Sequence, residues 1–345
     1  MSEEFEKGEF MLENNNKMAL EISQMVNETK NNLAKEINKS VTYVYWNIGR
    51  IIVKHENEDN NRLEYGKEIL KGLSKELTKL LGKGYSYTNL TYMRWFDNTY
   101  PDYNKISESL SWSHYIELIT IKDNDKRNFY EKECINSNWS VRELQRQLET
   151  SLFERLILSD GKVNKEKVLE LSKDGIILNK PSDIVKQPYV FEFLGLKEPK
   201  PILEKDLECK LIKHIEDFLL ELGKGFMFVG SQQRITLNNI DYYVDMVFYN
   251  KFLKSYVLID LKMNKLKAEN IGQMNMYLNY YENVINSEGD GKPIGIILCA
   301  EKDKVALEFA LGGLSNNIFA STYTYYIPDK KELINEVEKV LESNN

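Results

Sequence analysis

The sequence has few of the residues that build disulfide frameworks and transition-metal sites. Only 3 of its 345 residues are cysteines and only 3 are histidines. Cys134, Cys209 and Cys299 lie far apart with no paired spacing, which excludes a CxxC metal motif and argues against a disulfide framework. Because the histidines are equally scattered, a zinc site or a Ser-His-Asp triad would need unrelated segments to converge. Neither kind of site is expected.

Long apolar runs and an excess of positive charge are also missing. No hydrophobic run approaches the roughly 20 residues that span a bilayer, and residues 1–17 lack the apolar core of a signal peptide. The sequence therefore predicts a cytoplasmic protein with no membrane partner. With 46 basic and 53 acidic residues, the net charge is −7, which is not typical of proteins that bind nucleic acid by bulk electrostatics. Any such binding must depend on local patches and bound cations.

The hydrophobic pattern predicts two domains, because a chain of this length can bury two modest cores. Residues 1–16 are polar and predict a disordered tail. Apolar residues at helical spacing predict an all-α N-terminal domain over 17–160. Residues 161–200 predict a connector that packs on the second domain, which covers 201–345.

After Pro201 the pattern changes from helices to strands. Residues 203–223 predict one amphipathic helix closed by Gly223. The strands expected next are 226–237, 240–249 and 255–262, followed by a helix over 268–285, a strand over 293–300, a helix around 304–311 and a strand over 318–327. The order αβββαβαβ predicts a mixed central sheet flanked by helices, and thus an α+β protein overall.

One predicted strand carries charges that a buried strand has little reason to hold. Alternate residues of a strand share a face, so Asp260 and Lys262 point the same way while Ile259 and Leu261 point into the core. Charges inside a sheet are costly. This strand is therefore a candidate functional element.

The preceding strand supplies a second carboxylate. If the two strands pair as an antiparallel hairpin with Tyr249 opposite Tyr256, Asp245 lies directly opposite Asp260, with Cβ atoms about 5 Å apart. Two facing carboxylates repel each other and favour a hard divalent cation, and Lys262 can hold a water molecule or a phosphate oxygen. The pattern favours phosphoryl chemistry. The alternative is a structural ion-pair cluster at a sheet end.

These motifs resemble those of the YhcG-type PDDEXK nuclease family, within the PD-(D/E)XK nuclease superfamily. The likeness is carried in the second half by FMFVGSQQ, YYVDMVFYN and VLIDLKMNKLKAENIGQMNMYLNYY, and in the first half by YVYWNIGRII, GYSYTNLTYMRWF, SWSHYIELI and NWSVRELQRQL. The resemblance implies a helical N-terminal domain followed by a restriction-endonuclease-like (PD-(D/E)XK) α/β domain. It also implies magnesium as the cofactor, with manganese as an alternative.

The resemblance also implies a role for particular residues. Asp245 and Asp260 would ligate the metal together with the Leu261 carbonyl, and Lys262 would position or activate the attacking water. Asp260 stands where the family usually has glutamate, which could shift the metal preference. Glu208 matches an acidic position that can complete the metal shell.

Further positions follow from the same resemblance. Gln273 and Tyr277 match a QxxxY element; at i and i+4 they share one helix face and could reach the site or the DNA backbone. For Tyr277 an ordinary polar helix face is an equal alternative. Asp206 and Glu216 are alternatives to Glu208 as the additional acidic ligand, and Val244 replaces the proline of the motif.

In the first half, residues 79–101 resemble a helix-turn-helix, with Gly82–Gly84 as the turn and Ser86–Phe96 as the second helix. Lys83, Tyr87 and Arg94 are the candidate contacts to nucleic acid. The alternative is a plain helical core without contact to DNA.

The sequence as a whole predicts a magnesium-dependent nuclease that hydrolyses phosphodiester bonds in DNA, as an endo- or exodeoxyribonuclease. Its N-terminal domain would serve DNA targeting or assembly, and a homodimer is one arrangement it allows. The alternatives are a non-catalytic DNA-binding or scaffold protein that retains the nuclease fold, and RNA as the substrate. Metal binding at Asp245 and Asp260 would separate the enzyme from the scaffold.

Overall fold

The computed structural model describes residues 2–58, 63–158, 165–196, 203–301 and 317–326, together with positions 329, 331, 333, 335 and 337. The chain divides into two compact units, 1–127 and 128–345. No helix of these described ranges is long and apolar enough to cross a membrane.

The first unit is helical. Its elements are α1 (Ser2–Glu58), α2 (Leu63–Leu81), η1 (Lys83–Tyr85), α3 (Tyr87–Thr99), η2 (Tyr103–Lys105) and α4 (Trp112–Ile119). Residues 2–16, where the sequence analysis expects a disordered tail, form the start of α1. The physical reason is composition: this stretch contains several glutamates and no proline, and glutamate is a good helix former.

The core of the first unit lies where α1, α2 and α3 meet, around Ile52, Leu70, Leu90 and Met93. Gly49 lets α1 approach α3 closely, because a Cβ at this position would lie 2.0 Å from the Met93 carbonyl oxygen.

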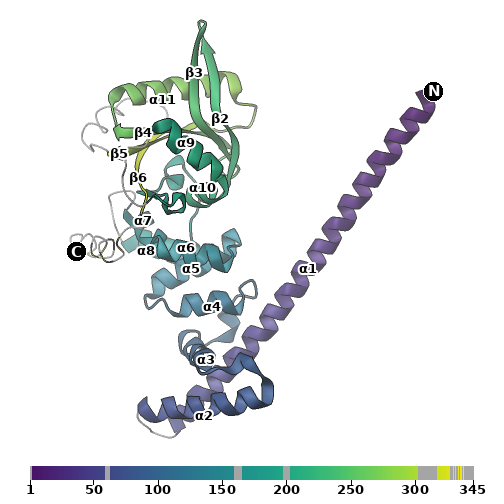
Figure 1. Ribbon diagram of the computed structural model, residues 1–345, viewed down its shortest axis with the longest axis vertical. Coiled ribbons are helices and arrows are strands. Elements are labelled where there is room, and N and C mark those ends of the chain that lie inside the picture. Colours follow the sequence, from purple (N-terminus) through teal and green to yellow (C-terminus); the bar gives the residue numbers. More distant parts are fainter. Residues whose placement is uncertain are drawn as a thin grey trace. The chain divides into compact units, whose positions relative to one another are not determined.

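The second unit consists of helices and one sheet (Figure 1). Its helices are α5 (Asn124–Ser137, which begins in the first unit), α6 (Val141–Glu149), α7 (Leu152–Leu158), α8 (Lys165–Asp174), η3 (Pro181–Ile184), η4 (Glu192–Leu194), α9 (Glu204–Lys213), α10 (Ile215–Leu222), α11 (Ala268–Tyr280) and η5 (Tyr281–Ile285). Its strands are β1 (Tyr189–Val190), β2 (Phe226–Leu237), β3 (Ile240–Asn250), β4 (Ser255–Lys265), β5 (Ile294–Glu301) and β6 (Asn317–Thr324).

The six strands form one mixed sheet, in the order β1-β6-β5-β4-β3-β2. The pairs β2–β3 and β3–β4 are antiparallel, and the remaining neighbours are parallel. Helices α9 and α10 pack on one face and α11 on the other (Figure 1). The mixed sheet flanked by helices confirms the predicted fold class. The helix expected around 304–311 lies outside the described residues.

Two details of this unit differ from expectation. The single helix predicted over 203–223 is interrupted at His214, where the backbone leaves helical geometry (φ −110°, ψ 38°), so α9 and α10 are separate helices. Both nevertheless pack on the same core through Leu211 and Phe218. Gly223, with φ 106°, ends α10 as predicted.

Helices α6 and α7, which the sequence analysis assigns to the domain 17–160, belong to the same unit as the sheet. A buried ion-pair cluster, defined here as Arg146, Arg155, Lys186, Glu192 and Glu221, joins them to it. Arg155 Nη1 lies 2.6 Å from Glu221 Oε1, with both side chains fully buried, and Arg146 Nε lies 2.8 Å from Glu192 Oε1. The boundary between the two compact units, between residues 127 and 128, therefore lies earlier in the chain than the predicted boundary at 160.

Candidate active site

The candidate site lies where the ladder between β3 and β4 ends. Tyr249 pairs with Tyr256 as predicted, but the last pair is Met246 with Ile259, so Asp245 does not pair with Asp260 as the predicted register required. Beyond this pair, the Asp245 side chain takes the place of a backbone acceptor: its Oδ2 accepts a hydrogen bond of 2.8 Å from the Leu261 N–H. The two strands thus hold Asp245 beside the backbone of β4.

Strand alternation, which underlies the predicted side-chain directions, holds for β4 but not for β3. Ile259 and Leu261 point into the core under α9 and α10, as expected. On β3, however, Val244 and Val247 both belong to the core under α11, although they are three positions apart. The alternation therefore slips around Asp245, next to the point where the pairing of β3 with β4 ends.

Asp260 and Lys262 form the charged centre of the site. Lys262 Nζ lies 2.8 Å from Asp260 Oδ2 and 3.7 Å from Glu204 Oε2. It also donates a hydrogen bond of 3.1 Å to the Leu261 carbonyl oxygen. The Asp260 side chain is buried, so one lysine is shared by several carboxylates in a desolvated setting.

A glutamine that was not predicted links two of the acidic residues. Gln232 Nε2 donates to Glu208 Oε2 (2.8 Å) and to Asp245 Oδ1 (3.3 Å). Gln232 has φ 48°, a left-handed conformation that a residue with a side chain seldom adopts. The strained backbone aims its amide between the two carboxylates. In the sequence, the only signal is a polar run at 231–233 that interrupts a β-rich segment.

Of the three candidates for the additional acidic ligand, only Glu208 is buried next to the site. Glu208 is buried and connected to Asp245 through Gln232, whereas Asp206 and Glu216 are exposed. Glu204, which was not singled out, lies beside Lys262 and accepts a hydrogen bond from the Met263 N–H (3.2 Å).

Gln273 and Tyr277 share one face of α11 and contact each other. Gln273 Nε2 donates to the Tyr277 hydroxyl oxygen (2.6 Å), and that hydroxyl donates to the Tyr243 carbonyl oxygen (3.0 Å). Because Tyr243 lies two residues before Asp245, the pair anchors β3 next to the site. Tyr277 is buried, which suits an anchor rather than a contact to DNA.

The carboxylates of the site resist ionisation. Burial, together with the nearby Asp245, raises the pKa of Asp260 to about 6, although Lys262 opposes the shift. Burial also raises the pKa values of Asp245 and Glu208. Burial alone would lower the pKa of Lys262, but Asp260 and the other carboxylates raise it. A protonated Lys262 can bind a phosphate oxygen or orient water.

The donor set fits a hard divalent cation. Asp245, Asp260, Glu208 and the Leu261 carbonyl offer only oxygen atoms, which magnesium prefers. Burial raises the pKa values of the three carboxylates, and a bound cation would favour their ionised form. Within the described ranges, no group of three or more His, Cys, Asp or Glu side chains is already arranged around a common metal position. The carboxylates would therefore adjust on binding.

The predicted helix-turn-helix residues lie in the first unit, at α2, η1 and α3. Lys83 is exposed, while Tyr87 packs against the core of the unit. Arg94 Nη1 lies 3.0 Å from Glu56 Oε1 on α1. The Arg94 guanidinium therefore forms an ion pair within the first unit.

The sheet order, with an acidic pair and a lysine on adjacent antiparallel strands, defines the PD-(D/E)XK nuclease fold. The model of the YhcG PDDEXK nuclease domain matches residues 182–338, and that of the DUF1016 N-terminal domain matches residues 21–155. "Putative nuclease YhcG" of Escherichia coli (strain K12) is 34% identical over 349 residues, covering 92% of each chain. The chain therefore belongs to the YhcG family of PDDEXK nucleases.

A solved structure, that of a repair endonuclease from Pyrococcus abyssi, is a more distant likeness. It shares 14% identity over 36% of this chain and 49% of that chain, with a TM-score of 0.25. Because the TM-score is so low, this likeness supports no conclusion about the present chain.

Proposed function

We propose that the chain is a magnesium-dependent deoxyribonuclease whose site is formed by Asp245, Asp260 and Lys262. The observation that carries the proposal is the convergence of a buried carboxylate (Asp260), a half-buried carboxylate (Asp245) and one cationic amine (Lys262) at the end of a strand ladder. A structural ion pair would have no reason to keep such an excess of negative charge.

Each residue has a physical role in phosphodiester hydrolysis. Asp245, Asp260 and Glu208 would hold the cation, which when bound would neutralise charge that develops on the phosphate and favour ionisation of water. Lys262, protonated by its acidic surroundings, would hold a phosphate oxygen or orient the attacking water. Gln232 would keep Glu208 and Asp245 at a fixed separation.

The decisive experiment incubates the purified chain with supercoiled, linear, branched and single-stranded DNA, and with single-stranded RNA. Magnesium or manganese is added in one series and a chelator in the other. We expect cleavage of DNA only with metal, and none by Lys262→Ala. Metal-dependent cleavage of RNA alone would overturn the choice of substrate. Absence of metal binding to wild type, measured by calorimetry, would favour the non-catalytic scaffold.

For the first unit we propose a contact to the DNA backbone through Lys83 and the turn between α2 and α3. Ser86 caps α3 by accepting the Asn89 N–H (3.3 Å), so the turn has a defined conformation, and Lys83 on it is exposed. Lys83→Glu should weaken DNA binding in chelator without changing the melting temperature. Unchanged affinity would favour the plain helical core.

The same unit supports a homodimer. Apolar side chains at helical spacing along α1 are each at least 40% exposed: Met18, Ile22, Val26, Leu33, Ile37, Val44 and Ile51. The stripe extends over about 50 Å at 1.5 Å per residue, and long helices with such stripes are typical of coiled coils. We propose that α1 of a second copy covers it.

Light scattering of the full chain tests the dimer. Wild type should have the mass of two chains, and Leu33→Glu with Ile37→Glu should have the mass of one. Glu21→Lys with Glu28→Lys, at exposed positions of the same helix, is the matched control and should remain dimeric. A monomeric wild type would contradict this proposal.

A further inference from the structure

A cavity of about 320 Å³ lies in the second unit, away from the candidate active site. It is lined by residues of α5, α6 and α10 and by the turn between β3 and β4. That turn begins after Asn250, five residues beyond Asp245 along β3, or roughly 17 Å at about 3.4 Å per residue. The volume lies in the range of about 300–1,000 Å³ that is usual for small-molecule sites.

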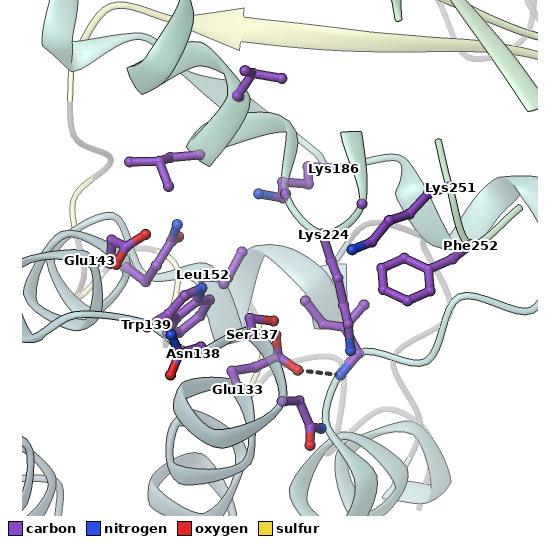
Figure 2. Close-up of a pocket in the computed structure, with 17 residues that line it drawn as sticks. Glu133, Ser137, Asn138, Trp139, Glu143, Leu152, Lys186, Lys224, Lys251 and Phe252 are labelled. Atoms are coloured by element: carbon purple, nitrogen blue, oxygen red, sulfur yellow. Dashed lines mark hydrogen bonds between the residues drawn. The ribbon is translucent and has the colours of Figure 1, made fainter. Parts of the chain in front are cut away.

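One side of the cavity carries three lysines, Lys186, Lys224 and Lys251, called the lysine wall here. Figure 2 shows them with Phe252 on one side, facing Trp139 and Glu143 on the other. Lys224 Nζ and Lys251 Nζ lie 5.3 Å and 5.1 Å from the centre of the Phe252 ring. The ring therefore holds two ammonium groups at the same edge of the cavity, which would otherwise repel each other.

The acidic residues of the cavity compensate only part of this wall, because three lysines face two glutamates and the Glu133 carboxylate already attracts Lys224 and Lys186. Glu133 Oε1 accepts a hydrogen bond of 2.6 Å from the Ile176 N–H (Figure 2), and burial raises the pKa of Glu133. Glu143 accepts the Ser140 N–H at the start of α6. With three lysines against two carboxylates, the cavity keeps a positive excess that suits an anion.

The opposite side offers an aromatic surface and an unsatisfied acceptor. The Trp139 ring lines the cavity and is half-buried. Gln147 is 3% exposed, and its Oε1 has no hydrogen-bond partner among the described residues. A buried acceptor without a partner is costly, so a ligand that donates a hydrogen bond there would stabilise the protein.

We propose that this cavity binds a nucleoside monophosphate, whose phosphate the lysine wall holds and whose base lies against Trp139 and Gln147. A nucleobase combines a planar surface for stacking on an aromatic ring with amino groups that donate hydrogen bonds. The phosphate supplies a negative partner for Lys224 and Lys251, whereas Lys186 already donates to the Glu221 carbonyl oxygen. A bare anion would leave Gln147 unsatisfied, and an uncharged aromatic molecule would leave the lysines unpaired.

Isothermal titration calorimetry with adenosine 5′-monophosphate tests the proposal. The host is the full chain carrying Lys262→Ala, and a chelator is present, so the result does not depend on the nuclease activity. We expect adenosine 5′-monophosphate to bind more tightly than adenosine or inorganic phosphate. Lys224→Ala with Lys251→Ala should weaken binding about tenfold or more, because two charge-assisted hydrogen bonds are lost.

Both substituted lysines are at least partly exposed, so the double variant should fold, and its melting temperature without ligand checks this. The matched control, Lys132→Ala with Lys213→Ala, removes two exposed charges elsewhere and should bind like the host. Equal affinity of host and Lys224→Ala/Lys251→Ala would overturn the site, as would absence of binding at millimolar ligand. Binding of a thymidine decamer but not of the mononucleotide would overturn it in favour of a strand-binding surface.

Discussion

The second unit contains two buried charged clusters that differ in how their charges are balanced. In the ion-pair cluster, the fully buried Glu221 contacts Arg155 and Arg146, and Lys186 donates to its backbone carbonyl. Although burial opposes ionisation, these cations lower the pKa of Glu221 to about 2. At the candidate active site, Glu204, Asp245 and Asp260 share Lys262, and the pKa of Asp260 is raised to about 6, chiefly by burial. The carboxylate of the first cluster is neutralised within the protein, whereas the second cluster has more carboxylates than cations.

The largest expected effect is on activity. Lys262→Ala should reduce cleavage by about 10³-fold, the usual cost of removing one electrostatic contact to a transition state. Cleavage rates on linear DNA with magnesium measure this. Lys213→Ala, at an exposed position of α9, is the control and should retain full activity; equal loss in both variants would contradict the assignment.

Breaking the ion-pair cluster should instead affect folding. Arg155→Met leaves Glu221 buried without its closest cation, which should lower the free energy of unfolding by about 3–5 kcal/mol. Urea denaturation at neutral pH measures the change. A loss below about 1 kcal/mol would mean that Arg146 and Lys186 alone can neutralise Glu221.

The same cluster should make stability depend on pH in acid. The pKa of Glu221 is lower in the folded chain than its ordinary value of 4.5, so its contribution is fully present above about pH 4.5 and is lost as the pH falls toward 2. Between pH 5 and pH 3 the loss should be on the order of 2 kcal/mol. Glu221→Gln should remove this part of the pH dependence, and an unchanged slope would count against it.

A smaller effect is expected where Gln232 positions the carboxylates. Gln232→Ala should lower cleavage about tenfold, since a hydrogen bond to a charged group contributes about 1.5–3 kcal/mol. More magnesium should be needed for half-maximal activity, because Glu208 and Asp245 are no longer held together. Gln233→Ala, at the neighbouring position, is the comparison; a larger loss there would shift the role to Gln233.

The smallest expected effect is the change in stability that Asp260→Asn causes in the absence of metal. In chelator, Asp260→Asn should be at least as stable as wild type, because the substitution removes a buried charge that is poorly neutralised. Melting temperatures in chelator and in magnesium decide, with Asp245→Asn measured alongside. If Asp260→Asn melts clearly below wild type in chelator, the pair with Lys262 is structural and the contrast between the two clusters disappears.

The sequence was sufficient to predict five of the six strands, β2 to β6, and the register of the hairpin between β3 and β4. Strand periodicity and the hairpin between β3 and β4 are local, so the pairing of Tyr249 with Tyr256 follows from spacing alone. The bridging by Gln232 depends on a backbone conformation at φ 48°, which no periodicity reports. The pair Arg155–Glu221 joins residues 66 positions apart. Such contacts are set by tertiary packing and could not be predicted from either segment.

The irregular course of β2 also bears on how molecules of this protein meet one another. β2 is the outermost strand of the sheet, and it carries the exposed apolar residues Met227, Phe228 and Val229. An open edge of this kind is a template for pairing with a foreign strand. The register shift between Phe228 and Gly230 and the left-handed Gln232 interrupt the row of backbone donors and acceptors. The geometry that holds the acidic residues thus also protects the protein from strand-to-strand aggregation.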